Sequence, residues 1–257
     1  MSSACRPTLA SFRHLDFDDT TYSLCPEESP TPCPALLGSV GRVGILHPPI
    51  LRDTGGAKMR IVTGRRRMLA AKEARRDIST ACLIMPEDSS EEDALVISLE
   101  DTILRGNVSM AEQAIFFSKI LDFVDEAHAA RRFLPLLGQA PNPETVGQLL
   151  ELLDLEERLL LAVHQGVLHA GVARSLRGLS FIDRLSLFEA MEAAGLPPAD
   201  QHRFALGCRE LATRQGSSIM AVLAEPGLRQ VLAGQDDPAG KAGQLMQWLE
   251  GRGVGGE

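Results

Sequence analysis

The sequence predicts a mixed α+β protein in which a small α/β domain precedes an all-helical region with a helix–turn–helix. Short apolar runs alternate with helical segments through the first hundred residues, whereas the pattern is helical from Arg105 onward. We therefore expect an α/β domain at residues 1–104, a helical domain at 105–180 and a C-terminal helical region at 181–257 with a frayed tail.

The first domain is expected to alternate strands and helices. Prolines and glycines mark the boundaries, because proline favours extended chain and Gly44 is suited to close a helix. The predicted order is an edge strand within Phe12–Phe17, a helix Ala35–Val43, strands Ile50–Arg52 and Met59–Val62 joined by the turn Asp53–Gly56, a helix from Arg65 to about Arg76–Asp77, a strand Ile78–Met85, an acidic loop Pro86–Asp93 and a helix Ala94–Leu104.

The remaining chain is predicted to be helical. Ser109 and Glu112 have capping-box spacing, and apolar residues recur at helical intervals after them. A helix–turn–helix is expected from Phe133–Leu137, Gly138 and Glu144–Leu153. Further helices are expected at Leu155–His164, His169–Leu176, Ser180–Ala194, Pro197–Arg214 and Ile219–Leu232, before a Gly-rich tail at Gly251–Glu257.

The composition is that of an ordinary globular protein. The 257 residues are 44% hydrophobic and 23% charged, and aromatics make up 4%, too few for a base-stacking platform. No apolar run reaches membrane-spanning length and the first residues lack a signal-peptide core, so we expect a cytoplasmic protein with no membrane partner. The five cysteines are scattered, which favours free thiols, with Cys82 buried in an apolar run.

One stretch is suited to hold an anion. Ile61–Lys72 is predicted as a strand, a Thr63-Gly64 turn and a helix start with Arg65, Arg66 and Arg67. A glycine lets the backbone approach a ligand, a helix N-terminus presents free N–H groups, and arginines bind phosphate or carboxylate. The alternative is a solvated basic helix start.

The charge distribution singles out the same stretch. The net charge is −8, but residues 65–76 carry six Lys or Arg and one acid, and residues 77–104 carry eight acids and no Lys or Arg. The acidic remainder argues against broad binding along a phosphate backbone.

Three blocks in order resemble the ParB family, whose members have a ParB/sulfiredoxin-like α/β domain followed by a helix–turn–helix domain. Ser39 with Gly44-Ile45-Leu46-His47-Pro48-Pro49-Ile50 is similar to S-x-x-x-x-G-I-x-Q-P-I. Gly64–Lys72 is similar to G-E-R-R-x-x-A-A-K, and Leu99-Glu100-Asp101 with Arg105 and Met110–Ala114 is similar to E-N-x-x-R…P-x-E-x-A. Gln148–Leu155 and Gly166–Leu176 resemble later family motifs, so the resemblance extends over about residues 36–180.

The resemblance implies a CTP pocket with Mg²⁺. Carried over by motif, Glu100 serves Mg²⁺ and is the catalytic candidate, and Asp101 takes the place of the family's Asn at the metal. The nucleotide and phosphate candidates are Gly44, His47, Thr63, Gly64, Arg65, Arg66, Arg67 and Arg105, and Thr20 and Thr21 near the first strand are added for their hydroxyls and not by motif. A carboxylate together with triphosphate oxygens suits Mg²⁺. Arg65 replaces the family's Glu associated with nucleotide turnover, so we expect binding rather than hydrolysis.

The DNA-binding candidates are Thr145, Gln148, Arg174 and Arg177. The predicted recognition helix carries Glu144 and Glu151 and no Lys or Arg, although Thr145 and Gln148 are able to read bases. The region is therefore either a DNA-binding domain or a helical packing domain that no longer binds DNA.

These observations leave three functions open. The first is a nucleotide-responsive, DNA-associated protein of the partition or transcription-regulator type, nucleoid-associated in a bacterium if it binds DNA. The second is an enzyme, a CTPase or a nuclease of the ParB-like class. The third is a protein–protein adaptor with a degenerate helix–turn–helix. A homodimer or another protein partner is expected.

Overall fold

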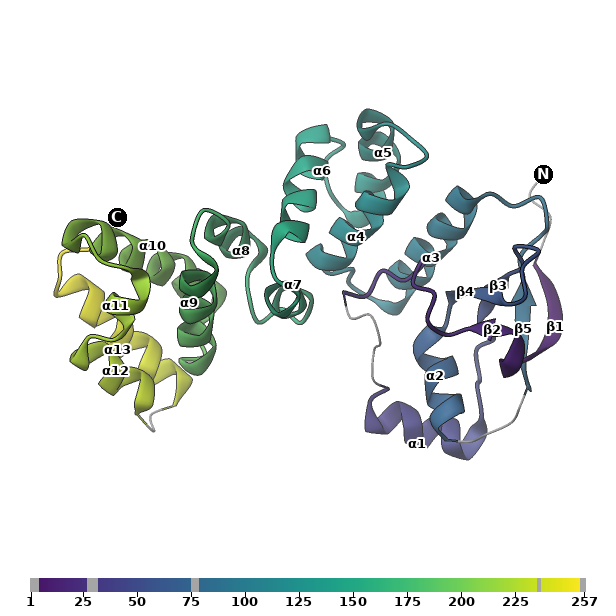
Figure 1. The fold of residues 1–257 in the computed structure, drawn as a ribbon, viewed down its shortest axis with the longest axis horizontal. Helices are drawn as coiled ribbons and strands as arrows, with labels where there is room; N and C mark the ends of the chain where they lie inside the picture. Colours follow the sequence, from purple (N-terminus) through teal and green to yellow (C-terminus); the bar gives the residue numbers. More distant parts are fainter. Residues whose placement is uncertain (1–4, 27–31, 75–78, 235–236, 255–257) are drawn as a thin grey trace. The chain divides into compact units, whose positions relative to one another are not determined.

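The chain folds into a mixed α+β unit and an all-helical unit (Figure 1). The computed structural model describes residues 5–26, 32–74, 79–234 and 237–254. Unit 1 comprises residues 1–108 and 112–147, and unit 2 comprises residues 109–111 and 148–257. The predicted α+β fold class is confirmed. The finer division at residues 104 and 180 stays a prediction.

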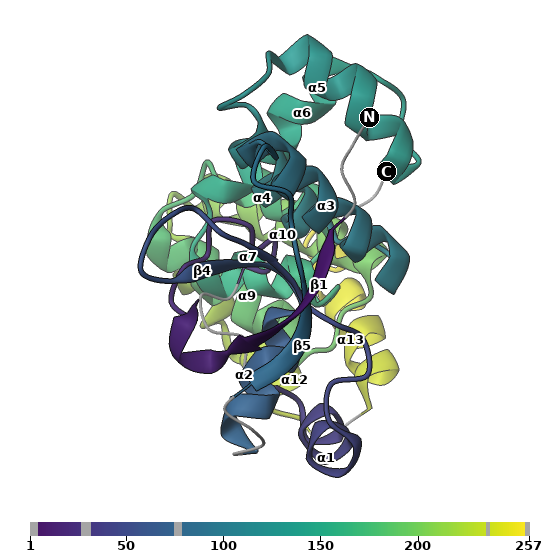
Figure 2. The ribbon, with the colours of Figure 1, turned by 90° about the vertical axis from the view of Figure 1, so that its right-hand side faces the viewer.

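Unit 1 contains a five-stranded mixed sheet in the order β1-β5-β3-β4-β2. The strands are β1 Arg6–Ser11, β2 Leu15–Asp16, β3 Ile50–Arg52, β4 Met59–Thr63 and β5 Ser79–Ile84. β1 pairs antiparallel with β5, as Figure 2 shows, and β3 is parallel to β5 and antiparallel to β4. The short β2 is parallel to β4. The predicted strands from β3 to β5 are therefore present.

The predicted edge strand within Phe12–Phe17 was wrong in its position. A 3₁₀ turn, η1 Phe12–His14, separates β1 from β2, and the long edge strand lies upstream at Arg6–Ser11. Pro7 sits in β1 opposite Leu83, and an edge strand tolerates proline because its outer N–H groups need no ladder partner.

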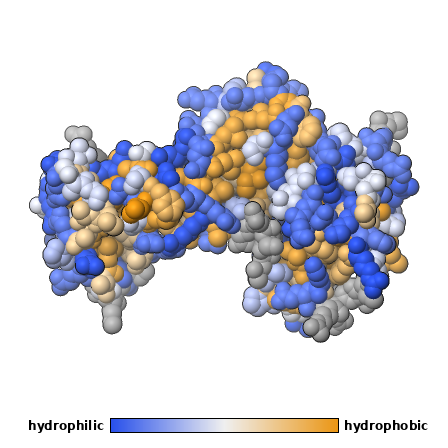
Figure 3. Space-filling model, viewed as in Figure 1, coloured by the Kyte–Doolittle hydropathy of each residue, from blue (hydrophilic) through white to orange (hydrophobic). Residues whose placement is uncertain are grey.

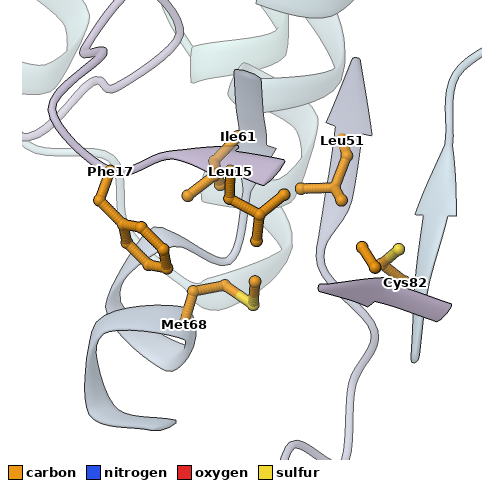
Figure 4. Close-up of a cluster of buried hydrophobic side chains, with 7 residues drawn as sticks. Leu15, Phe17, Leu51, Ile61, Met68 and Cys82 are labelled. Atoms are coloured by element: carbon orange, nitrogen blue, oxygen red, sulfur yellow. The ribbon is translucent and has the colours of Figure 1, made fainter. Parts of the chain in front are cut away.

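Two apolar clusters pack α2 Arg65–Glu73 between the sheet and α1 Pro34–Val43. The first joins α2 to the sheet through residues from all five strands and the loop after β2, and Figure 4 shows Leu15, Phe17, Leu51, Ile61, Met68 and Cys82 pointing toward one another. The second joins Val40 of α1 to Ala70 and Ala71 of α2. These contacts hold the N-terminus of α2 at the end of β4. The predicted end of this helix near residues 76–77 lies outside the described residues.

α3 Glu91–Arg105 begins earlier than expected. The acidic stretch Glu91–Asp93 was predicted as a loop but forms the first helical turn. Ser90 caps the helix by accepting from the Asp93 N–H at 3.0 Å, and Asp93 accepts from the Ser90 N–H at 2.8 Å. Acids in a first turn are also favoured by the helix dipole.

The next segment contains three helices, α4 Met110–Ile120, α5 Glu126–Phe133 and α6 Pro143–Leu150. α5 was not predicted from the sequence. Asp125 caps this helix by accepting from the His128 N–H at 2.8 Å. The predicted helix Phe133–Leu137 is the end of α5 followed by the 3₁₀ turn η2 Leu134–Leu137. A second 3₁₀ turn, η3 Glu151–Asp154, follows α6.

Unit 2 continues as helices α7 Glu157–His164, α8 Ala170–Leu176, α9 Phe181–Ala193, α10 Pro198–Gln215, α11 Ile219–Leu223, α12 Pro226–Ala233 and α13 Pro238–Glu250. The predicted single helix Ile219–Leu232 is two helices, because Pro226 starts a new one. α13 was not predicted, and Val254 is buried rather than frayed. The last predicted tail residues, 255–257, lie outside the described residues.

The viewed surface of unit 2 carries both hydrophobic and hydrophilic side chains. Figure 3 shows hydrophobic side chains interspersed with hydrophilic ones on the viewed face. Within the described ranges, no helix combines the length and apolar character needed to cross a bilayer.

Candidate functional site

The Gly64 turn, residues 63–67, joins β4 to α2 and requires glycine for two reasons. Gly64 adopts φ 83° and ψ 13°, a left-handed conformation that costs other residues free energy. A Cβ atom at this position would lie 2.9 Å from Cβ of Pro49, closer than atoms pack. The neighbouring Thr63 is buried, and its Oγ1 accepts from the Ile50 N–H at 3.3 Å. Thr63 therefore supports the strands, and Gly64 brings the loop before β3 against the start of α2.

The three arginines of this turn point to different partners. Arg65 donates through Nη1 to the carbonyl of Asp19 and through Nη2 to the carbonyl of Phe17. Arg67 donates to the carbonyl of His47. Arg66 is exposed and has no hydrogen-bond or ion-pair partner within the described part of the chain. Arg65 therefore holds the loop after β2, Arg66 is exposed to solvent, and Arg67 contacts the loop before β3.

Arg67 belongs to a cluster with an excess of positive charge. Its Nη2 lies 3.9 Å from Oδ1 of Asp101, and Nε of Arg105 lies 3.2 Å from Oδ2 of the same carboxylate. Burial lowers the pKa of Arg67, the Asp101 carboxylate opposes that shift, and Arg105 adds to it. Two guanidinium groups thus share one carboxylate at a partly buried position. A bound anion would supply the missing charge.

The loop before β3 contributes mainly its backbone. Gly44 ends α1 with φ 75°, and its N–H donates to the Val40 carbonyl at 2.9 Å. The His47 side chain is exposed while its carbonyl accepts from Arg67. Pro49 is buried, and its carbonyl accepts from the Leu83 N–H at 2.9 Å. Gly44 and His47 therefore lie in a loop that Arg67 and β5 hold in place beside the Gly64 turn.

The two predicted metal residues differ in availability. Asp101 faces Arg67 and Arg105, whereas Glu100 is exposed and has no recorded partner in the described ranges. No set of three or more His, Cys, Asp or Glu side chains among the described residues is arranged to hold a metal. Magnesium in nucleotide sites commonly takes one or two carboxylates and completes its shell with phosphate and water. Glu100 fits that limited role better than Asp101.

Thr20 and Thr21 lie in a loop after β2, residues 17–24, which we call the Thr20 segment. Side chains from other elements of unit 1 hold this loop in place. Arg65 reaches its carbonyls from α2, and Lys119 of α4 donates to the carbonyls of Thr20 and Ser23, both at 2.7 Å. Thr20 is half-buried and Thr21 is exposed. The sequence analysis did not identify Lys119, because nothing in the local pattern of α4 indicates a contact 99 residues away.

A second group missed from the sequence surrounds Tyr22. This buried side chain donates to Glu91 and accepts from Nη1 of Arg52 at 2.7 Å. Arg60 lies 3.0 Å from Asp19 Oδ2 and 3.7 Å from Glu91 Oε1. The network fixes the Thr20 segment to β3, β4 and the start of α3. Tyr22 is the only tyrosine in the chain, but only the tertiary structure reveals its partners.

The DNA candidates do not form a basic surface of their own. On α6, Thr145 is half-buried and Gln148 is exposed. In unit 2, Arg174 is half-buried, and Arg177 lies 3.1 Å from Glu151 and forms a second ion pair with Asp154. Two carboxylates therefore already neutralise Arg177, which argues against a phosphate contact for this side chain.

The chain is similar in sequence to known chromosome-partitioning proteins. A probable chromosome 1-partitioning protein ParB from Deinococcus radiodurans is 29% identical over 161 residues, which cover 63% of this chain and 53% of the relative. The chromosome-partitioning protein Spo0J from Thermus thermophilus is 31% identical over 151 residues, 58% of this chain and 52% of the relative. The chain thus spans about half the length of the curated relatives it matches. No family model matches.

Two solved structures of C-terminally truncated chromosome-partitioning ParB from Caulobacter crescentus also match. One, complexed with CTP-gamma-S, is 18% identical, covers 72% of this chain and 98% of that chain, and has a TM-score of 0.31. The other, complexed to the centromeric parS site, is 19% identical, covers 77% of this chain and 98% of that chain, and has a TM-score of 0.40.

The motifs that carry the resemblance lie close together in the fold. The three ParB-like blocks, in family order, lie at the loop before β3, at the Gly64 turn and along α3, and the contacts of Arg67 join them. The matches to curated relatives include chromosome-partitioning proteins of several bacteria. Over 58–63% of its length, the chain is therefore similar in sequence to chromosome-partitioning proteins of the ParB and Spo0J type.

Proposed function

We propose that the chain is a nucleotide-responsive, DNA-associated protein of the partition type, which binds nucleotide phosphates at the Gly64 turn. The observation that carries this proposal is the cluster in which Arg67 and Arg105 share the single carboxylate of Asp101 beside a glycine turn. The names of the curated relatives support the partition role. In this proposal the protein acts in the bacterial cytoplasm at the nucleoid, as a homodimer or with a protein partner.

Phosphate binding would use backbone and side chains together. The first turn of α2 has N–H groups without helical partners, and Arg66 is open to solvent beside them. Arg67 and Arg105 would contribute charge from the other side, and Thr20 and Thr21 would contribute hydroxyls. CTP is the nucleotide that the motif resemblance implies.

Magnesium would be held by Glu100 with phosphate oxygens, and it would offset phosphate charge. We propose binding with little or no hydrolysis, because Arg65 stands where the family has a Glu and its guanidinium is occupied by the carbonyls of Phe17 and Asp19. A CTPase or nuclease remains the alternative. Such an enzyme would need Glu100, so a Glu100→Gln protein with full turnover would argue against it.

Calorimetry tests nucleotide binding. CTP, ATP and GTP with Mg²⁺ are titrated into the wild type, Arg66→Ala and the control Arg13→Ala, which removes an exposed arginine from η1 of the same unit. Binding by the wild type and the control, with a loss of about tenfold or more in Arg66→Ala, supports the proposal. No binding by the wild type refutes it.

A specific observation favours an adaptor as the second candidate. Arginines of unit 2 are paired with acids of unit 2: Arg158 with Glu189 and Glu192, and Arg184 with Glu156. Few positive charges are therefore left for DNA phosphates. A gel shift against random duplex at low and moderate salt separates the two functions, because a DNA binder loses affinity as salt rises and an adaptor shows no shift at either concentration.

A further inference from the structure

Five of the eight carbonyls in the Thr20 segment accept hydrogen bonds from side chains of distant elements. Arg65 binds the carbonyls of Phe17 and Asp19, and Lys119 Nζ lies 2.7 Å from the carbonyls of both Thr20 and Ser23. Ser98 Oγ donates to the Tyr22 carbonyl at 2.7 Å. Donors from α2, α3 and α4 thus fix the path of this loop.

The segment is also folded on itself. Asp19 Oδ1 accepts from the Thr21 N–H at 2.9 Å, and the Ser23 N–H donates to the Thr20 carbonyl at 3.0 Å. Asp19 Oδ2 lies 3.0 Å from Nε of Arg60. In the described ranges no partner is recorded for the hydroxyls of Thr20 and Thr21. The backbone of the loop is therefore hydrogen-bonded to the rest of unit 1, while the hydroxyls of Thr20 and Thr21 are available to a ligand.

Lys119 occupies an unfavourable place for a charge. The ammonium is half-buried, and burial lowers its pKa to about 8. Arg65 adds to that shift and Asp19 opposes it. An apolar side chain would avoid this desolvation, so the hydrogen bonds to two carbonyls are what Lys119 contributes here.

We infer that Lys119, together with Arg65, is a positioning residue that holds the Thr20 and Thr21 hydroxyls for nucleotide binding. This inference rests on the proposed function. It gives Arg65 a role in ordering the loop instead of direct phosphate contact.

A double-mutant cycle tests the inference. Nucleotide affinity with Mg²⁺ is measured by calorimetry for the wild type, Lys119→Met, the hydroxyl-free variant Thr20→Val/Thr21→Val, and the combination of all three changes. Lys119→Met is expected to weaken nucleotide binding about tenfold relative to the wild type. In the hydroxyl-free variant the same change should have no effect on affinity, because the hydroxyls that Lys119 positions are absent. Lys119→Arg, which keeps the donors, should recover most of the affinity.

The matched control is Lys58→Met, which removes the same charge from the exposed loop after β3 and should bind like the wild type. Circular dichroism confirms that each variant is folded, and Lys119→Gln replaces Lys119→Met in the cycle if the latter does not fold. An additive cycle, or unchanged affinity in Lys119→Met, overturns the inference alone. Absence of binding by the wild type overturns the proposed function and the inference with it.

Discussion

Tyr22 offers a direct measurement at the scale of a single residue, because it is the only tyrosine in the chain. Burial, followed by the hydrogen bond to Glu91, raises the pKa of Tyr22 above its ordinary value of 10.0. The folded state therefore keeps the phenol proton at a pH where the unfolded state has lost it. This contribution to stability is complete below pH 10 and is lost as the pH rises through the native pKa.

Alkaline titration of tyrosinate absorbance checks this prediction. The midpoint should lie above 10 in the native protein and near 10 in denaturing urea, with Tyr22→Phe as the blank. Coincident titrations in the two conditions would show that the hydroxyl is not held by Glu91 and Arg52.

Gly64→Ala should destabilise the protein strongly for one added methyl group. The left-handed backbone costs roughly 1–2 kcal/mol, and the overlap with Pro49 adds about 1–3 kcal/mol. Urea denaturation measures the change in unfolding free energy. Gly41→Ala is the matched control, because Gly41 lies within α1 with open space around it, and alanine there should stabilise by roughly 0.5–1 kcal/mol. Equal effects at the two positions would contradict the turn geometry.

Individual residues also mark the limit of sequence reasoning. The glycine turn at position 64 was predicted from the strand–turn–helix pattern, although its left-handed backbone and its contact with Pro49 were not. The contacts of Arg65 were not, because the carbonyls of Phe17 and Asp19 come from a loop 48 and 46 residues away. Neighbouring arginines with the same local preference thus have different partners, which only the fold decides.

At the scale of an element, the start of α3 depends on its capping box. Ser90→Ala should lower the unfolding free energy by about 1 kcal/mol at neutral pH, since it removes the acceptor for the Asp93 N–H. Hydrogen bonds from Ser90 hold the pKa of Asp93 below its ordinary value, so this stabilisation is present above that value and is lost as the pH falls. The difference between wild type and variant should therefore shrink in acid.

Chemical denaturation at neutral and acidic pH measures that difference. Ser89→Ala is the control, because Ser89 contacts Arg52 through its backbone carbonyl, which the substitution keeps. A Ser89→Ala effect as large as that of Ser90→Ala would indicate that the cap is not the cause.

Elements were predicted best where a local signal was strong. Apolar runs bounded by prolines and glycines located β3, β4, β5 and α1. The predicted start of α3 was wrong because two signals competed. The acidity of Glu91–Asp93 favoured a loop, whereas the Ser90 cap starts the helix at Glu91. α5 and α13 were missed because their apolar signals are small: EAHAARRF has one large apolar residue, Phe133, and the large apolar residues of PAGKAGQLMQWLE all lie in its second half. Packing against the rest of the chain stabilises such helices.

At the scale of the whole molecule, the two units carry separate optical probes. Tyr22 lies in unit 1, and Trp248, the single tryptophan, lies in unit 2. The Arg252 guanidinium stacks 3.7 Å from the Trp248 ring and pairs with Glu225 at 2.8 Å. Arg252→Ala should change Trp248 fluorescence and lower the stability of unit 2 by about 0.5–1 kcal/mol, since the pair is only partly buried.

Urea unfolding followed by both probes gives the measurement. The transition seen by tryptophan fluorescence should move in Arg252→Ala, while the transition seen by second-derivative absorbance of Tyr22 stays in place. Gly64→Ala should do the reverse. Movement of both transitions in either variant would show that the units unfold as one.

The two edges of the sheet limit how this protein can recruit other chains. β1 carries Pro7, which lacks an N–H, and β2 has only two residues. A partner peptide that binds by strand addition needs a run of regularly spaced backbone donors and acceptors, and within the described residues β2 is too short to provide one and Pro7 interrupts the donors of β1. We therefore expect partners of unit 1 to recognise mainly its helices, loops and side chains, and the same edges to disfavour pairing between copies of the sheet.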